Sequence, residues 1–147
     1  MNLSAHGIRV GLPPGWEGRI YKRPDPAAQP VVHAANVALA PDDGDFATRT
    51  AERMPVDGAL IVMVEYDPVL ANTAQFAASG VPPLIEPSAA SPTHLLRRIP
   101  GQAGYQRFFN EQGRAFGLYV VIGAAVRAQT VMPKVNGVLA TVEIDPR

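Results

Sequence analysis

The last third of the chain constrains the fold most, because three segments of strand length follow one another there with short connections. The segments span residues 94–99, 105–110 and 114–123. Gln112-Gly113 separates the last two, and glycine accepts the positive φ of a tight hairpin turn without steric cost. Consecutive strands joined in this way pair side by side. The pattern therefore predicts an antiparallel meander of three strands.

An amphipathic helix is predicted directly after the meander, over residues 127–141. Four apolar residues share one face at spacings of three and four: Met132, Val135, Leu139 and Val142. Pro133 is harmless only in the first turn, and Gly137 costs about 1 kcal/mol relative to alanine inside a helix. We therefore expect this helix to be held by packing on the sheet rather than by its own propensity.

Shorter strands are predicted earlier in the chain, over residues 8–12, 18–23, 31–39 and 59–64. The segment 59–64 is apolar throughout, which is typical of a central strand covered on both faces. A short helix is predicted over 46–54, with Asp45 as the N-cap that accepts from the first-turn amides.

Residues 69–92 form the least regular part of the sequence. The segment 69–78 is compatible with a short helix, whereas 80–92 contains four prolines and is predicted to be an irregular excursion. Long irregular segments are unusual in compact domains and often carry function. We therefore expect a binding surface there.

These elements together predict one α+β domain over residues 1–147. The expected architecture is a mainly antiparallel sheet of about six or seven strands with two or three helices, the C-terminal helix packed on the sheet. A chain of 147 residues has the common size of a single domain with one hydrophobic core.

Composition excludes several classes of function. The chain has no cysteine, so disulfides, thiol catalysis and cysteine-based metal sites are ruled out. Its 13 basic and 13 acidic residues balance, which argues against a nucleic-acid partner. No apolar stretch reaches about 18 residues, so membrane insertion is not expected. The start of the chain has no signal-peptide pattern, and a cytoplasmic location is expected.

Residues that carry chemistry do not form a recognisable pattern. The three histidines (His6, His33 and His94) are too far apart in sequence for a helical metal pair. The acidic cluster at residues 42–45 lacks the ligand spacing of a calcium loop. A glycine-rich phosphate loop and a nucleophile elbow are absent. We expect no catalytic residue, no cofactor and no metal ligand, and we do not expect an enzyme.

Four residues are candidates for contacting a partner: Trp16, Tyr105, Arg107 and Arg114. Tryptophan is enriched in interface hot spots, although Trp16 beside a turn is equally suited to capping the core. Strand alternation places Tyr105, Arg107 and Phe109 on one face. Arginine in the meander binds a carboxylate or phosphate, or forms a cross-strand ion pair, for which the chain offers Glu65, Glu111 and Glu143.

Short motifs at both ends of the chain resemble one family. An early strand leads into Leu12-Pro13-Pro14-Gly15-Trp16, and the last helix runs into Ala140-Thr141-Val142-Glu143-Ile144. This order is similar to the PsbP/Mog1-like domains, including the LpqN-type proteins of actinobacteria. The resemblance implies a small α+β fold and a mainly non-catalytic, partner-binding role, and it carries over no functional residue.

Two functions are expected from this reading. The first is a non-catalytic protein-interaction or accessory domain of a bacterial assembly, whose partner is another protein or further copies of this chain. An arginine-rich, alanine-rich and proline-rich composition is typical of bacterial genomes of high GC content. The alternative is a small-molecule or lipid-binding domain with a pocket between the sheet and the C-terminal helix.

Overall fold

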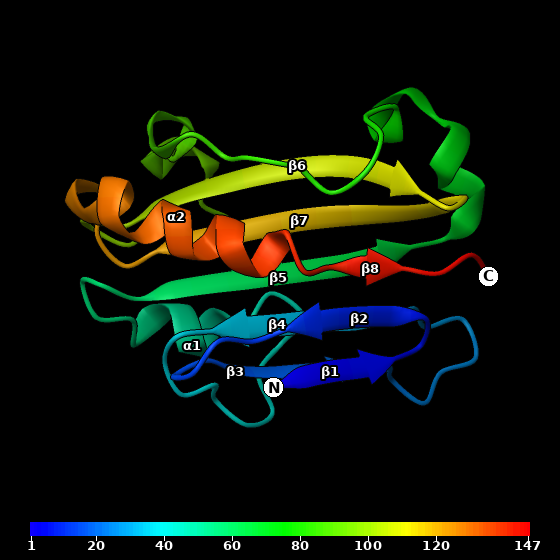
Figure 1. The fold of residues 1–147 in the computed structure, drawn as a ribbon, viewed down its shortest axis with the longest axis horizontal. Helices are drawn as coiled ribbons and strands as arrows, with labels where there is room; N and C mark the ends of the chain where they lie inside the picture. The colour runs from blue at the N-terminus through cyan, green and yellow to red at the C-terminus, as the bar shows by residue number, and fades with distance from the viewer.

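Two antiparallel sheets of unequal size form the protein in the computed structural model, which describes residues 1–147 (Figure 1). The smaller sheet has the order β1-β2-β8, with strands Asn2–Ala5, Ile8–Gly11 and Glu143–Ile144. The larger sheet has the order β3-β4-β5-β7-β6, with strands Glu17–Tyr21, Val31–Ala35, Ala59–Tyr66, Arg114–Ile122 and Ala103–Glu111.

Helical segments are short except for the last one. The α-helices are α1 (Thr48–Glu52) and α2 (Ala128–Leu139). Five 3-10 turns connect the strands: η1 (Pro68–Asn72), η2 (Ala74–Phe76), η3 (Pro87–Ala89), η4 (Pro92–His94) and η5 (Ala125–Arg127). The structure is therefore α+β and mainly antiparallel, as the sequence predicts. No helix has the length and apolar character needed to cross a bilayer.

The apolar run of β5 places this strand at the centre of the larger sheet. β5 pairs with β4 on one side and with β7 on the other, and its first five residues are all buried. The side chains on both sides of β5 must be apolar because both faces of the sheet are covered there. The prediction of a central strand over 59–64 is confirmed.

The front face of the larger sheet carries α2 and the smaller sheet as a second layer (Figure 1). A cluster of 21 buried residues joins both sheets and α2 into one core. Ile61 and Met63 of β5 point to this side, and the apolar stripe of α2, including Val131 and Val135, lies over them with no exposed surface. The predicted packing of the C-terminal helix on the sheet is confirmed.

The back face is covered at its two ends by separate segments. Leu60 and Val62 point to this side because strand side chains alternate, and they pack under α1 and the chain around it. Near the other end, Phe76 of η2 packs over Ala115 of β7. The middle of the back face, on the side of β6, lies between these two covering segments.

The predicted meander and single sheet are wrong in two respects. Residues 94–99 do not form a strand: Pro92 opens the turn η4, and only β6 and β7 form the hairpin. β7 pairs on its other side with β5 over eight residues, so the three neighbouring strands are β5, β7 and β6. The eight strands also divide into two sheets, because β8 pairs with β2 instead of joining the larger sheet.

Two local expectations about helices are also corrected. Asp45 does not cap α1: its carboxylate binds Tyr21 and Arg23, while the carboxylate of Asp43 accepts from the amides of Arg49 and Thr50. Pro133 is the sixth residue of α2, not part of the first turn. The helix survives there because its buried face is held by the core, as predicted for its packing.

Candidate functional site

The outer edge of β6 is the only edge of the five-stranded sheet that neighbouring chain closes at both ends and leaves open in the middle. At one end the amide and carbonyl of Gly104 bond to Ser91, each at 2.9 Å. At the other end Asn110 bonds through its amide to Ala78 and through its carbonyl to Gly80, each at 2.8 Å. These two closures lie about 20 Å apart along the strand, at about 3.3 Å per residue.

Between the two closures, Gln106 and Phe108 have free main-chain groups. Hydrogen-bonding direction alternates along an antiparallel strand. Since Gly104 and Asn110 bond outward, Gln106 and Phe108 must do the same, whereas Tyr105, Arg107 and Phe109 bond to β7. No main-chain group of the protein hydrogen-bonds to the outward main chain of Gln106 or Phe108. Two N–H donors and two carbonyl acceptors are left facing outward.

The back-face side of this edge is apolar and rigid. The rings of Phe108, Tyr66 and Phe76 pack against one another with centroids 5.4 to 6.1 Å apart. Beside them lies a narrow hollow of about 60 Å³, whose wall is completed by Phe46, Leu96, Gln106 and Tyr119 among others. The Gln106 side chain donates to the carbonyl of His94 at 2.7 Å, which fixes the edge to η4.

Gly117 of β7 forms the floor of this hollow. A Cβ atom added there would lie 3.0 Å from the Tyr66 ring and 3.3 Å from the Phe108 ring. The absence of a side chain at this position therefore lets the two rings close over the strand. The aromatic wall next to the free edge depends on this glycine.

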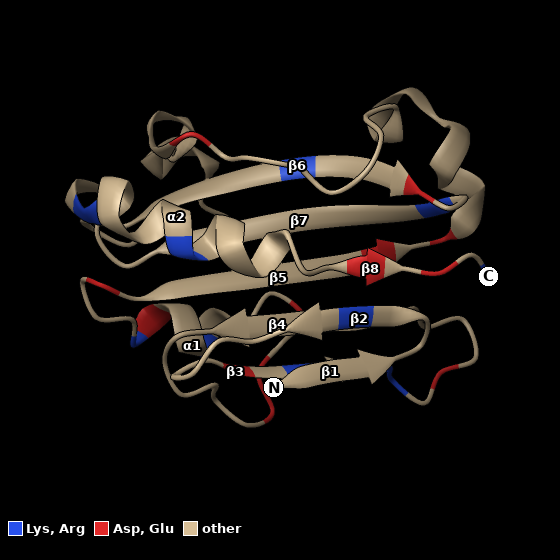
Figure 2. Ribbon diagram, viewed as in Figure 1, with Lys and Arg blue, Asp and Glu red and all other residues tan.

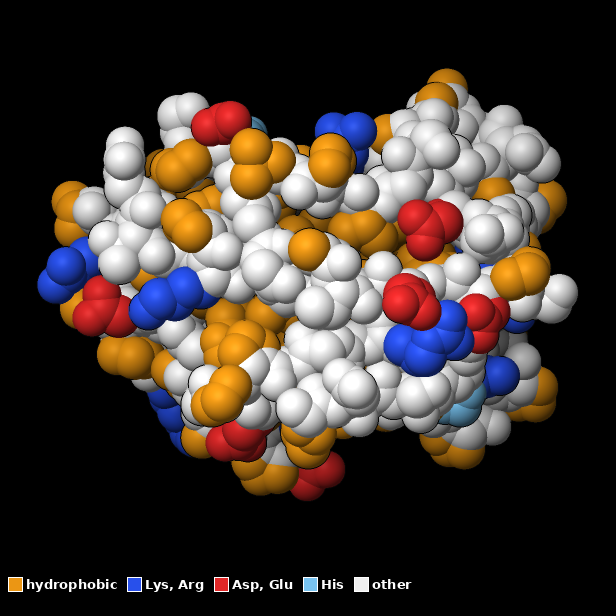
Figure 3. Space-filling view, viewed as in Figure 1, with side chains coloured by type: hydrophobic (Ala, Val, Ile, Leu, Met, Phe, Trp, Pro, Cys, Tyr) orange, Lys and Arg blue, Asp and Glu red, His pale blue; other side chains and the backbone are white.

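The front-face side of the edge carries an unpaired positive charge. Arg107 is exposed and takes part in none of the ion pairs of the protein. Figure 2 shows this basic position in the middle of β6, away from acidic residues of the same strand. In Figure 3 the upper margin of the molecule is hollowed between two lobes, and a basic side chain stands in that hollow.

The structure brings two of the four predicted contact residues to this edge. Tyr105 and Arg107 point to the front face from the open part of β6, with Tyr105 half-buried against the core. Trp16 precedes β3, at the opposite side of the sheet, and packs partly on the main core. Arg114 begins β7 and is almost fully buried. Neither Trp16 nor Arg114 belongs to the open edge.

Arg114 is saturated by partners within the chain. Its guanidinium forms a two-point ion pair with Glu65, with N–O distances of 2.7 and 3.0 Å. Its other hydrogens reach the carbonyls of His6, Gly7 and Asp145. This pair ties β5 and β7 to the β1–β2 turn and to the end of the chain. It is a cross-strand ion pair with Glu65, one of the alternatives open from the sequence.

His33 of β4 belongs to a second buried polar cluster, together with Arg19 and the carbonyl of Asp45. Arg19 donates from Nε to His33 Nδ1 at 3.0 Å, so the ring proton resides on Nε2, which donates to the carbonyl of Asp45 at 2.7 Å. Burial, together with the Arg19 charge, lowers the pKa of His33 below its usual range, although the Asp45 carbonyl opposes the shift. The group anchors the 41–47 loop to the sheet.

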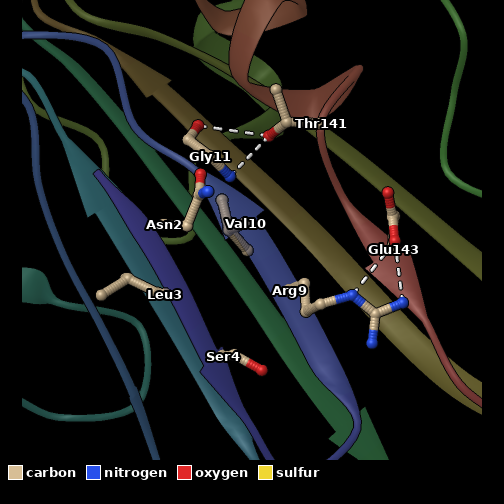
Figure 4. Close-up of a pocket in the computed structure, with 8 residues that line it drawn as sticks. All are labelled: Asn2, Leu3, Ser4, Arg9, Val10, Gly11, Thr141 and Glu143. Carbon is tan, nitrogen blue, oxygen red and sulfur yellow. Dashed lines mark hydrogen bonds and ion pairs between the residues drawn. The ribbon is translucent and has the colours of Figure 1, made fainter.

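A larger hollow of about 280 Å³ lies on the smaller sheet, between β1, β2 and the end of α2 (Figure 4). Its polar groups already bind one another. Thr141 Oγ1 accepts from the amide of Gly11 at 2.8 Å, and Arg9 pairs with Glu143 at 2.8 Å. Because its charges are paired and it holds no nucleophile–base pair, this hollow offers less to a partner than the β6 edge does.

Sequence reasoning did not find Gln106 and Phe108 as site residues. Their side chains look ordinary in a strand, and what matters is their main chain. The signal would have been an outermost strand flanked by segments that touch only its ends, and this is known only once the strand order is known. Gly80 and Ser91 of the proline-rich segment frame the gap.

Comparisons with known proteins do not add a relative. No family model, no curated protein and no solved structure matches the chain. The resemblance to PsbP/Mog1-like domains therefore stays a prediction.

Proposed function

We propose that this chain is a non-catalytic protein-interaction domain, an accessory part of a larger bacterial assembly, that holds an extended segment of a partner on the β6 edge. The single observation that carries the proposal is the free main chain of Gln106 and Phe108, framed by closures at Gly104 and Asn110. Adding a strand to an exposed edge is a common mode of peptide recognition.

The frame around the gap favours a specific partner over general edge-to-edge aggregation. Proteins protect edge strands by covering them or by placing charge on them. Here the chain closes both ends of β6 and leaves space for about three residues of added strand, with Arg107 at its centre. A long flat strand does not fit this gap, whereas a short extended segment does.

The alternative function, a ligand pocket between the sheet and α2, has less support. Val131, Met132 and Val135 of α2 lie directly on the sheet and have no exposed surface. The hollows described above lie on the other face of the larger sheet or on the smaller sheet. We therefore place binding at the β6 edge.

The test compares main-chain and side-chain changes at one position. Peptides would be selected from a random displayed library on the wild-type protein, and their affinity measured by fluorescence polarisation. Gln106→Pro removes the outward N–H and leaves the β7 pairing intact, so affinity should fall at least about tenfold, the equivalent of roughly one hydrogen bond plus the steric block. The matched control Gln106→Ala keeps the N–H and should bind nearly as the wild type does.

Two results would contradict the proposal. One is equal affinity of the selected peptides for Gln106→Pro and the wild type. The other is a selection in which no peptide is enriched above background. Circular dichroism and thermal melting of Gln106→Pro establish that the variant is folded before binding is compared.

A further inference from the structure

We infer that the segment held by the β6 edge has an acidic residue between two apolar residues. This inference rests on the proposed function, because it describes the partner of the same edge. It follows from the way side chains alternate along β6 and from the charge that the edge presents. The partner is thereby identified by its chemistry, as a short extended acidic–apolar segment of another protein.

The alternation of β6 sorts the partner's side chains between the two faces. A strand that bonds to Gln106 and Phe108 places the residues opposite them on the back face, and the residue between them on the front face. This assignment holds for parallel and antiparallel docking alike, because both have a side-chain period of two. The central residue of the partner therefore lies beside Arg107.

The front-face position calls for a carboxylate. Arg107 is exposed and has no ion-pair partner in the chain, and its planar guanidinium suits two-point binding of a carboxylate. In antiparallel docking, the residue opposite Arg107 occupies a pair without mutual hydrogen bonds, where the side chains approach most closely. Opposite charges in such a pair stabilise the added strand, and a basic residue there would be repelled.

The back-face positions call for apolar side chains. The residue opposite Phe108 meets a ring that is half-buried and held in the aromatic cluster with Tyr66 and Phe76. An apolar side chain there covers exposed carbon that a polar one would leave in contact with water. The residue opposite Gln106 lies next to the same wall, where the Gln106 amide is already occupied by the His94 carbonyl.

A second copy of this chain is a poor occupant of the edge. Only one twofold register uses all four free groups of each copy, and it pairs Gln106 with Phe108 of the other copy. That register puts Arg107 directly opposite its own symmetry mate. Like charges directly opposite one another destabilise a strand pair. The charge on the edge therefore favours a different protein.

The experiment is a charge swap read out by peptide selection. Random short peptides would be selected on three full-length proteins: the wild type, Arg107→Glu and Arg98→Glu. Arg98 is also exposed and unpaired, but it lies outside β6, which makes it a matched control. Wild type and Arg98→Glu should both enrich an acidic residue flanked by apolar ones. Arg107→Glu should enrich lysine or arginine at the same central position.

Affinity measurements separate this inference from the proposed function. A wild-type-selected peptide should lose at least about tenfold in affinity on Arg107→Glu and regain it when its acidic residue is changed to lysine. Peptides that bind the edge, by the Gln106→Pro criterion, but show no acidic preference would overturn the inference and leave the proposed function standing. A selection that enriches no peptide at all on the wild type would overturn both.

Discussion

Glu65 is almost completely buried, and two guanidinium groups hold its charge. Arg114 is buried with it, whereas Arg147 reaches Glu65 Oε2 from the surface at 2.6 Å. A buried charge that keeps its hydrogen-bonding partners is tolerated, but a buried charge that loses one is costly. At the residue scale, the buried charge of Glu65 therefore depends on the two guanidinium groups that contact it.

Replacing Arg114 should destabilise the protein strongly. Arg114→Met leaves the Glu65 carboxylate buried and removes the guanidinium donor of the His6 and Asp145 carbonyls, so the free energy of unfolding should fall by about 3 kcal/mol. The value is at the lower end of the roughly 3–5 kcal/mol that breaking a buried ion pair costs, because Arg147 still contacts Glu65. Urea titration followed by circular dichroism measures the loss. Arg9→Met, which breaks two exposed ion pairs, with Glu143 and Asp145, is the control and should cost much less.

His33 should make stability depend on pH. Because the pKa of His33 is lowered in the folded protein, the unfolded chain binds a proton more readily. Its contribution to stability is complete above the ordinary histidine pKa of about 6.5 and is lost as the pH falls below it. Urea midpoints measured from pH 7.5 to pH 5 should decline in the wild type and less steeply in His33→Gln.

The control for that experiment is His94→Gln, which removes an exposed histidine. The decline should persist in this variant. An identical decline in His33→Gln and in the wild type would show that another group is responsible.

At the element scale, α2 keeps two residues that weaken a helix. Pro133 and Gly137 are both exposed, while the opposite side of the helix is buried. The helix therefore owes its stability to the core beneath it. Improving its propensity on the solvent side should stabilise the protein without disturbing that packing.

Gly137→Ala should raise the free energy of unfolding by about 0.5–1 kcal/mol. A Cβ atom at this position meets nothing within 4 Å, so only the gain in helix propensity remains. The measurement is a urea titration. Gly123→Ala is the opposing control, because its Cβ would collide with the main chain of Pro55 and should destabilise the protein.

The open edge of β6 predicts an alternating pattern of amide exchange. The amides of Tyr105, Arg107 and Phe109 bond to β7 and should exchange slowly, whereas those of Gln106 and Phe108 face outward and should exchange quickly. Hydrogen exchange followed by NMR measures this in the free protein. Slow exchange of all five amides would mean that the edge is already occupied.

At the scale of the whole molecule, the two sheets share one core. The 21-residue cluster takes residues from both sheets and from α2, and the Glu65–Arg114 pair links the larger sheet to the β1–β2 turn of the smaller one. Elements with a common core unfold together. The prediction of one domain over residues 1–147 can therefore be tested by cooperativity.

Unfolding should occur in one transition. Trp16 packs against the shared core near the smaller sheet, so its fluorescence reports there, while far-ultraviolet circular dichroism reports on all strands. The two signals should give the same urea midpoint and slope. Two separated midpoints would instead show that the sheets unfold independently.

Much of the local structure was predictable because it depends on neighbouring residues. The Gln112-Gly113 turn has positive φ at both positions, as a tight hairpin requires, and α2 occupies most of the predicted range. The segment 94–99 shows the limit of this reasoning. Its apolar residues suit a strand, but after Ser91 pairs with Gly104 the chain turns onto the back face, where the Leu96 amide donates to the Tyr119 hydroxyl, so the segment adds no strand to β6.

Periodicity and turn residues act over short distances, so the residues alone predict the α+β class, the central strand, the hairpin and the packed C-terminal helix. The division into two sheets, the burial of Arg114 and the outermost place of β6 come from contacts between distant segments. Strand order depends on which distant segments pair, and that choice is made by the whole core. The candidate site consists of main-chain groups left over from this choice, so no side-chain pattern announces it.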